Sequence, residues 1–311
     1  MTAIYNTKKK KSLKTSFEVC LCLVIFILAI VYGGLLKEGV IYGFKICAFN
    51  IIPTLFPFFI LSDLWGAVIC YQENSLMAKC FEKIFHINSE GLSAFVIGNI
   101  CGFPLGAKIA AKKHQSGDIN KIELDSLMTI SNNPSLAFVV SGIGVGLFHS
   151  IKIGIILYFS VLISAVISGL IFRPTVTESS KPLNKTKQSF NLIESINSAG
   201  FSSIAVSSYI IFFSGIIGVV KSLVKNEIMV SLISSFLEVG SGCSIIAECN
   251  EALGVFHLPL ISFTLAFSGL SVFMQTFSFL PQSISKIKYL LKKFFQGIIS
   301  ALITFLLHYI M

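Results

Sequence analysis

Nine apolar segments, each about as long as a membrane-spanning helix, dominate this sequence. They cover residues 17–36, 45–70, 91–111, 127–148, 150–172, 197–220, 228–249, 255–281 and 290–311. A helix needs about 20 mostly apolar residues to cross the hydrocarbon core of a bilayer. Only 13% of the 311 residues are charged, roughly half the share found in soluble domains. The sequence therefore predicts an all-α protein, a polytopic transmembrane helical bundle with the lipid bilayer as its partner.

Several other classes of protein are disfavoured. The formal net charge of +9 is read as a topology signal, so no nucleic acid partner is expected. The eight cysteines form no C-x-x-C pair and the five histidines no i, i+4 pair, so no metal site is expected. There is no G-x-x-x-x-G-K-[ST] loop for ATP and no catalytic constellation. We expect no enzyme and no cofactor, although a coupling ion, H⁺ or Na⁺, stays open for a secondary or facilitated carrier.

Four of the apolar segments contain glycine, proline and polar residues at positions that interrupt a simple helix. They are 91–111, 127–148, 228–249 and 255–281. Irregular backbone at membrane depth survives where protein or a watery cavity shields it, and broken helices of this kind build transporter binding sites. An ordinary kinked helix is the alternative for any one of them, but four such segments favour a site.

The order of the segments repeats. After a leading transmembrane helix at 17–36, residues 40–172 read as plain, broken, broken, plain, and residues 197–311 read the same way. A polar linker at 173–196 separates the two halves. This pattern is typical of an internal structural repeat. We expect each repeat to hold one re-entrant hairpin, 91–111 or 228–249, and one broken helix.

The lysines and arginines indicate the orientation. With the basic tail 1–16 in the cytoplasm and two hairpins that return to their own side, 19 basic residues lie on the cytoplasmic side and five on the other. This asymmetry fits the positive-inside rule. It predicts a multi-pass cell-membrane protein with seven full spans, a cytoplasmic N-terminus, a cytoplasmic linker and two inverted repeats.

The candidate substrate-binding residues are those at the interruptions. Pro134 cannot donate a backbone hydrogen bond, so the neighbouring backbone carbonyls and side-chain amides become available for a ligand. The full set is Asn99, Gly102, Pro104, Gly106, Lys108, Asn132, Asn133, Pro134, Ser135, Glu238, Ser241, Gly242, Ser268, Ser271 and Gln275.

Two charged members of this set have open alternatives. Glu238 either binds a proton or cation, or lies at a helix end facing the interface. Lys108 either meets an anionic substrate group or is one more cytoplasmic topology charge. An ionisable group at the centre of a membrane helix costs roughly 2.5–3.5 kcal/mol on insertion scales, so each of them needs a physical reason.

The motifs resemble those of the YlbJ-type sporulation integral membrane proteins. The resemblance rests on residues 98–108, 132–135 and 142–146, more weakly on 237–242 and 267–275, and spans roughly residues 40–310. That family belongs to the nucleoside recognition or gate domain group, which is similar in pattern to concentrative nucleoside carriers. The resemblance implies inverted repeats with two hairpins, and a role in endospore formation that includes movement of dipicolinic acid.

Three functions remain open at this stage. The first is a secondary or facilitated transporter of a small anionic metabolite, dipicolinic acid among them, in a membrane that surrounds the forespore. The second is a carrier of nucleosides or other small solutes with Glu238 as the coupling group. The third is a non-transporting membrane protein needed for spore maturation, with a second copy or other sporulation membrane proteins as partners.

Overall fold

The computed structural model describes residue 23 and residues 26–69, 75–174, 191–281 and 283–310. Over these ranges the chain folds into helices and short connections, with no strand, as predicted. The predicted basic tail, residues 17–22, 24 and 25 of the predicted leading helix, and most of the predicted linker lie outside the described residues.

The first half of the fold starts from a long helical stretch. The elements in chain order are α2 (Gly33–Ile46), the π-helical η1 (Cys47–Ile51), α3 (Ile52–Ile69), α4 (Leu76–Phe85), the 3₁₀ turn η3 (Ser89–Gly91), α5 (Leu92–Cys101), α6 (Leu105–Gln115), α7 (Lys121–Ser131), the π-helical η4 (Phe138–Val145), α8 (Gly146–Phe148) and α9 (Ile151–Ile171).

The second half begins with the longest described helix, α10. Its elements are α10 (Leu192–Leu223), α11 (Glu227–Leu237), α12 (Val239–Glu248), α13 (Asn250–Leu253), the 3₁₀ turn η5 (Gly254–Phe256), α14 (His257–Phe267), α15 (Gly269–Phe279) and α16 (Lys286–Ile310).

One predicted boundary differs from the structure. Residues 37–44 were expected to connect the leading helix to the next span, but they lie inside α2, and helical structure continues from Gly33 to Ile69. The interruption lies instead at Tyr32, whose backbone leaves the helical region just before Gly33. The charged residues Lys37 and Glu38 suggested a loop, but they occupy one turn of a continuous helix.

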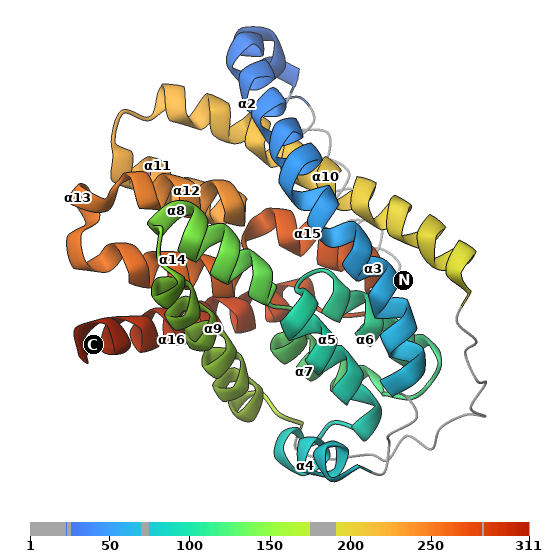
Figure 1. Ribbon diagram of the computed structural model, residues 1–311. Helices are drawn as coiled ribbons and strands as arrows, with labels where there is room; N and C mark the ends of the chain where they lie inside the picture. Colours follow the sequence, from blue (N-terminus) through green and yellow to red (C-terminus); the bar gives the residue numbers. More distant parts are fainter. Residues whose placement is uncertain (1–22, 24–25, 70–74, 175–190, 282, 311) are drawn as a thin grey trace, which may run out of the picture.

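The helical stretch α2 to α3 packs along α10 (Figure 1). Gly39 and Gly43 lie against Ser214, and a methyl group at Gly39 would stand 2.4 Å from the Ser214 carbonyl oxygen. Cys47 contacts the carbonyl oxygen of Ser207 further along, so the two stretches are antiparallel. Small residues let helix backbones approach closely where lipid provides no hydrophobic drive for association.

The charged residues gather at two ends of the molecule. At one end, which we call the Lys152 end, the exposed Lys221 and Glu248 come within 3.9 Å of each other, and the rings of Phe148 and His257 are in contact. At the other, the Lys292 end, Lys292 pairs with Asp125 at 2.6 Å. The 21-residue helix α9 joins the two ends and measures about 31 Å at 1.5 Å per residue.

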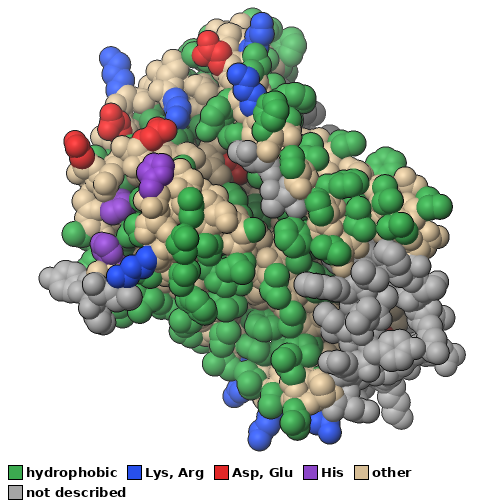
Figure 2. Space-filling view, in the orientation of Figure 1, with side chains coloured by type: hydrophobic (Ala, Val, Ile, Leu, Met, Phe, Trp, Pro, Cys, Tyr) green, Lys and Arg blue, Asp and Glu red, His purple; other side chains and the backbone are tan. Residues whose placement is uncertain are grey.

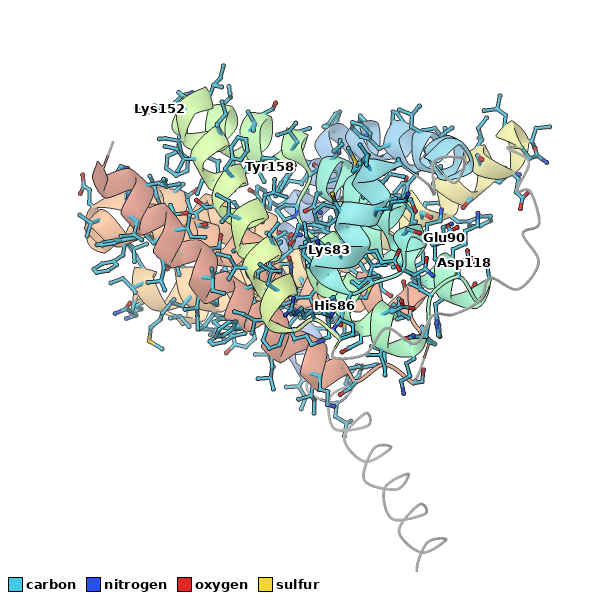
Figure 3. All side chains as sticks on the ribbon, turned by 90° about the horizontal axis from the view of Figure 1, so that it is seen from below. Lys83, His86, Glu90, Asp118, Lys152 and Tyr158 are labelled. Carbon is cyan, nitrogen blue, oxygen red and sulfur yellow. The ribbon has the colours of Figure 1, made fainter. Side chains whose placement is uncertain are left out.

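Figure 3 shows the same separation. Lys152 lies at the start of α9, whereas His86 lies near its far end and contacts the carbonyl oxygen of Pro174 at 3.0 Å. Glu90 and Asp118 both pair with Lys113, the latter at 3.5 Å. Between the ends, Figure 2 shows a broad apolar surface on the face that it draws. Large apolar side chains elsewhere in the described chain are also strongly exposed, and Phe201 of α10 is 76% exposed.

Four helices in the described part of the chain are long and apolar enough to cross a membrane: Ile151–Ile171, Leu192–Leu223, Asn250–Phe279 and Lys286–His308. Seven full spans were predicted, and these four match the predicted segments 150–172, 197–220, 255–281 and 290–311. Of the remaining three, 17–36 is described only at residues 23 and 26–36, and 45–70 ends in residues that are only partly described. The third, 127–148, divides into two short helices because residues 132–135 are not helical.

The four interrupted segments differ in how their two helical pieces pack. Helices α5 and α6 pack against each other, and so do α11 and α12, because the chain turns back after Cys101 and at Glu238. In contrast, α7 is followed by η4, and α14 by α15, without such packing between the two pieces. Each of α7 and α14 has 11 residues, which is about 16 Å and half the thickness of a hydrocarbon core of about 30 Å.

The contacts between elements also repeat when the halves are exchanged. Helix α7 packs on α16 as α14 packs on α9, and α6 packs on α15 as α12 packs on α8. Helix α7 begins at the Lys292 end, whereas its counterpart α14 begins at the Lys152 end. Helices α7 and α14 therefore run in opposite directions between the two ends of the molecule.

Candidate functional site

The first break, residues 132–135, ends a well-formed helix. Asn120 caps α7 by accepting from the backbone nitrogens of Ile122 and Glu123, in a capping box. The helix stops at Ser131, because the backbone of Asn132 is no longer helical and Pro134 follows. Residues 132–135 are all buried, so backbone and side-chain polar groups must find partners inside the protein.

The turn between α5 and α6 lies directly against this break. Phe103 donates its backbone N–H to the carbonyl oxygen of Asn133 at 2.8 Å. Gly102 has a φ of +84°, and a methyl group there would lie 2.4 Å from the backbone nitrogen of Ser135. Only glycine combines that backbone conformation with such a close approach. The predicted site residues Gly102 and Ser135 are thus brought together.

Two more glycines explain the tight packing of α5, α6 and α7. A methyl group at either Gly98 or Gly106 would lie 2.0 Å from the carbonyl oxygen of Ser131. The backbones of the three helices therefore meet just before the break. In the sequence motif 98–108, Gly106 was expected to bind a ligand, but in the structure it allows this contact. Pro104 precedes the first residue of α6.

Side-chain amides tie the break to α5. Asn133 donates to the side-chain oxygen of Asn99 at 2.9 Å and to the carbonyl oxygen of Ile130 at 3.0 Å. Asn99 in turn donates to the carbonyl oxygens of Phe95 and Ile130. Its own carbonyl oxygen accepts from the Tyr158 hydroxyl at 3.1 Å. The three predicted residues Asn99, Asn132 and Asn133 belong to one buried network.

The centre of this network is a residue that the sequence analysis did not select. Lys293 of α16 is 0% exposed. Its ammonium nitrogen donates to the carbonyl oxygen of Asn132 at 3.0 Å, to Asn133 Oδ1 at 3.0 Å and to Gln296 Oε1 at 2.7 Å. Gln296 donates back to Asn133 Oδ1 at 2.8 Å. We call these four residues the Lys293 network.

Every partner of Lys293 is a neutral amide oxygen. In the described part of the chain no carboxylate lies within ion-pair distance of its nitrogen, since Asp125 pairs with the neighbouring Lys292. The ammonium has as many acceptors as it has N–H donors, but its charge is not balanced. A buried charge without a counter-ion is costly and marks functional sites in membranes.

A sequence signal for Lys293 did exist. Lys293 belongs to a buried polar stripe on α16 with a helical spacing of three or four residues, which consists of Tyr289, Lys293, Gln296, Ser300 and Thr304. Such spacing places the side chains on one helix face. From the sequence, Lys293 is assigned, together with Lys292, to the basic residues of the cytoplasmic side. The segment 290–311 is therefore predicted as an uninterrupted helix without a site residue.

Asn132 joins the first break to the second half of the chain. Its side-chain nitrogen donates to Thr276 Oγ1 of α15 at 2.8 Å and to the Tyr289 hydroxyl of α16 at 2.7 Å. Its Oδ1 has no hydrogen-bond partner among the described residues, although it is buried. A buried acceptor without a partner is uncommon and calls for a ligand, a water or an ion.

The second break lies at Ser268 and Gly269, between α14 and α15. Both residues have positive φ values, 78° and 73°. A methyl group at Gly269 would lie 3.2 Å from the carbonyl oxygen of Ser235 and 3.4 Å from the backbone nitrogen of Glu238. The turn between α11 and α12 therefore lies against the second break, as the turn between α5 and α6 lies against the first.

Glu238 caps the N-terminus of α12. Its two carboxylate oxygens accept from the backbone nitrogens of Gly240, at 3.0 Å, and Ser241, at 2.6 Å, and the residue is 4% exposed. Of the two alternatives left open for Glu238, the structure shows the helix-end position, but with the side chain buried inside the protein. Beside it, Gly242 allows α12 to lie on α11, since a methyl group there would stand 2.7 Å from the Ser235 Cα.

Helix α15 connects the two breaks. It begins at Gly269, next to Glu238, and reaches Asn132 through Thr276, seven residues or about 10 Å later. Ser271 and Gln275 lie one turn apart between these contacts, and Gln275 donates to Ser271 Oγ at 3.2 Å. Gln275 Oε1 and Ser241 Oγ are further buried acceptors without partners in the described part of the chain.

Lys108, another predicted site residue, contacts α10 and α3. Its ammonium nitrogen donates to Ser198 Oγ of α10 at 2.9 Å and lies 5.6 Å from the centre of the Phe59 ring of α3. These contacts anchor α6 to the pair formed by α3 and α10. The basic residue that contacts the first break is Lys293.

The cysteines and acidic residues assemble no metal site in the described ranges. Cys47, Cys101, Cys243 and Cys249 are free thiols in buried positions, where cysteine behaves as a small hydrophobe.

Comparison with known proteins adds one similarity. The chain is 24% identical, over 301 aligned positions, to the sporulation integral membrane protein YlbJ of Bacillus subtilis (strain 168), and the alignment covers 83% of this chain and 74% of that protein. No family model matches the chain, and no solved structure matches it. The chain is thus similar, over most of both chains, to a sporulation integral membrane protein, and this similarity together with the apolar helices supports a multi-pass membrane protein.

Proposed function

We propose that this protein is a secondary or facilitated carrier of a small anionic metabolite. The observation that carries the proposal is the fully buried ammonium of Lys293, whose partners are all neutral. An anion that reaches the first break would balance this charge, which neither lipid nor a nearby carboxylate does. Removing a substrate from water is costly, and a buried opposite charge offsets part of that cost.

The arrangement of the helices supports transport. We propose that the two halves are inverted repeats, with α5–α6 and α11–α12 as re-entrant hairpins, because α7 and its counterpart α14 run in opposite directions. Both breaks come about 16 Å along their helices, close to the bilayer midplane. Carriers built from inverted repeats bind their substrates at such interrupted helices, and one repeat rocks against the other.

The charged ends support an orientation. The Lys292 end carries most of the described lysines, including Lys83, Lys112, Lys121 and Lys286. Cytoplasmic loops are enriched in lysine and arginine, so we place this end and the N-terminus in the cytoplasm. No partner is required by this proposal beyond the lipid bilayer and the solute, and a coupling ion is considered below.

Dipicolinic acid is the substrate that we propose within this class. The relative is named for sporulation, and the resemblance of the sequence motifs implies a role in moving this aromatic dicarboxylate into the spore. The membrane would then be one that surrounds the forespore.

Uptake of radiolabelled dipicolinate into proteoliposomes tests the proposal. We expect wild-type protein to move it, Lys293→Met to lose most of the flux, and Lys292→Met, the matched control, to retain it. No uptake by the wild type would contradict the proposal. In the organism, deletion of the gene should lower both spore dipicolinate and heat resistance, and normal values for both would speak against the spore role.

A second candidate rests on a different observation. The buried oxygens of Asn132 and Gln275 lack donors in the described part of the chain, and they would accept from N–H or O–H groups of a neutral solute such as a nucleoside. In that case Glu238 would be the group that couples transport to H⁺ or Na⁺. If nucleosides compete with uptake, this second candidate is supported. A non-transporting protein needed for spore maturation would instead tolerate Asn132→Ala and Gln275→Ala.

A further inference from the structure

The Lys293 ammonium occupies a cage of oxygen atoms at the first break. The three acceptors are a backbone carbonyl freed by the helix interruption, that of Asn132, and two amide oxygens, those of Asn133 and Gln296, at 2.7–3.0 Å. Backbone carbonyls at the interruptions of transporter helices are the groups that bind a coupling Na⁺. Three neutral oxygens match the three N–H donors of an ammonium group, and carbonyl oxygens of the same kind contribute to sodium sites.

We propose that Lys293 is a tethered replacement for that coupling cation, so that the protein holds its first break in the folded arrangement without Na⁺. The ammonium and Gln296 belong to α16, whereas the other two oxygen atoms belong to the break that follows α7. A cation carried by the chain itself supplies the positive charge at constant effective concentration, and no ion has to be recruited from solution. On this proposal Na⁺ is not a coupling ion at the first break of the wild-type protein.

The surroundings of the cage support this assignment. Four elements contribute to the buried network around it: α5 with Asn99, the first break with Asn132 and Asn133, α15 with Thr276, and α16 with Tyr289 and Gln296. Asn133 is held in place by two hydrogen bonds that its nitrogen donates and one that its carbonyl oxygen accepts. The side chains of Asn132, Asn133 and Gln296 thus each make hydrogen bonds that do not involve Lys293, and on our proposal removal of the lysine side chain leaves a preformed site.

The inference deepens the proposed function, since it concerns coupling at the same break, but its test needs no substrate. Purified full-length protein in detergent is unfolded thermally in equal concentrations of NaCl, KCl, ammonium chloride, methylammonium chloride or choline chloride. A cation that binds only the folded state raises the unfolding temperature with its concentration. Choline is too large for the cage and serves as the reference cation.

Wild-type protein should unfold at the same temperature in all five salts. Lys293→Ala should unfold several degrees lower in choline, and Na⁺, ammonium or methylammonium should restore much of the loss in a saturable manner. Lys293→Met, whose side chain fills the vacated space without a charge, should be destabilised but not restored. Lys292→Ala removes a lysine that pairs with Asp125 outside the cage and should show no cation specificity.

Two outcomes overturn the inference: stabilisation of the wild type by Na⁺ over choline, or failure of every small cation to restore Lys293→Ala. If Lys293→Ala cannot be purified, Lys293→Ser takes its place with the same expected restoration, and stabilisation of the wild type by Na⁺ over choline would still overturn the inference. Neither outcome depends on dipicolinate uptake, so failure of the proposed substrate and failure of the tethered cation are distinguishable.

Discussion

The backbone N–H of Phe103 donates to the carbonyl oxygen of Asn133 at 2.8 Å, and this one hydrogen bond joins the turn between α5 and α6 to the break in α7. The same asparagine accepts from Lys293 through its side chain. Three elements that are far apart in the sequence therefore depend on Asn133. Movement of any one of them would disturb the other two.

Replacing Gly106 tests the close approach of the helices. We expect Gly106→Ala to destabilise the protein by about 1–3 kcal/mol, as overpacking of a tight core does, because the methyl group would lie 2.0 Å from the Ser131 carbonyl oxygen. The control is Gly200→Ala on α10, where nothing lies within 4 Å and the better helix propensity of alanine should be neutral or favourable. Thermal unfolding in detergent measures both, and equal stability of the two variants would contradict the packing described.

Glu238 offers a test of helix capping. Glu238→Ala should cost about 0.5–2 kcal/mol, because the backbone nitrogens of Gly240 and Ser241 lose their acceptor in a buried place. Glu238→Asp, which keeps a carboxylate at the cap, should retain most of the stability. A Glu238→Ala protein as stable as wild type would show that capping is not what holds this residue in place.

A carboxylate next to Lys293 should compete with an anionic substrate. In Gln296→Glu the new carboxylate replaces the amide oxygen that accepts from Lys293 at 2.7 Å, so the ammonium acquires an internal counter-ion. We expect the variant to fold but to take up dipicolinate at least tenfold more slowly, which corresponds to about 1.4 kcal/mol. Gln115→Glu, on the exposed end of α6, adds the same charge at a distance and should transport normally.

The orientation can be checked by chemical labelling in intact cells. In a protein stripped of the other seven cysteines, the exposed thiol of Cys80 on α4 should react with a membrane-impermeant maleimide only after permeabilisation. Lys152→Cys, at the opposite end of α9, should react without it. The reverse pattern would mean that the Lys292 end faces outward.

Local composition was sufficient to locate the helices and their interruptions. The apolar lengths predicted the four long spans, and the glycine, proline and asparagine residues marked both breaks and both helix turns, because these residues act on their own backbone wherever the chain places them. Asn132 and Gly102 could be selected for the same reason. The predicted connection at residues 37–44 was wrong, because α2 packs along α10 and stays helical through the charged residues Lys37 and Glu38.

What only the tertiary structure decided is which polar group meets which. Lys108 and Lys293 look alike in the sequence, each a lysine at the edge of an apolar segment. The three-dimensional fold directs Lys108 to α3 and α10, and buries Lys293 against the break of a helix about 160 residues away in sequence. Hydrogen bonds between such distant residues depend on how whole helices pack, and no local pattern encodes that. By itself, the sequence determined that the chain crosses a membrane and where its helices break, and the packing of α16 on α7 determined which charge lies at the break.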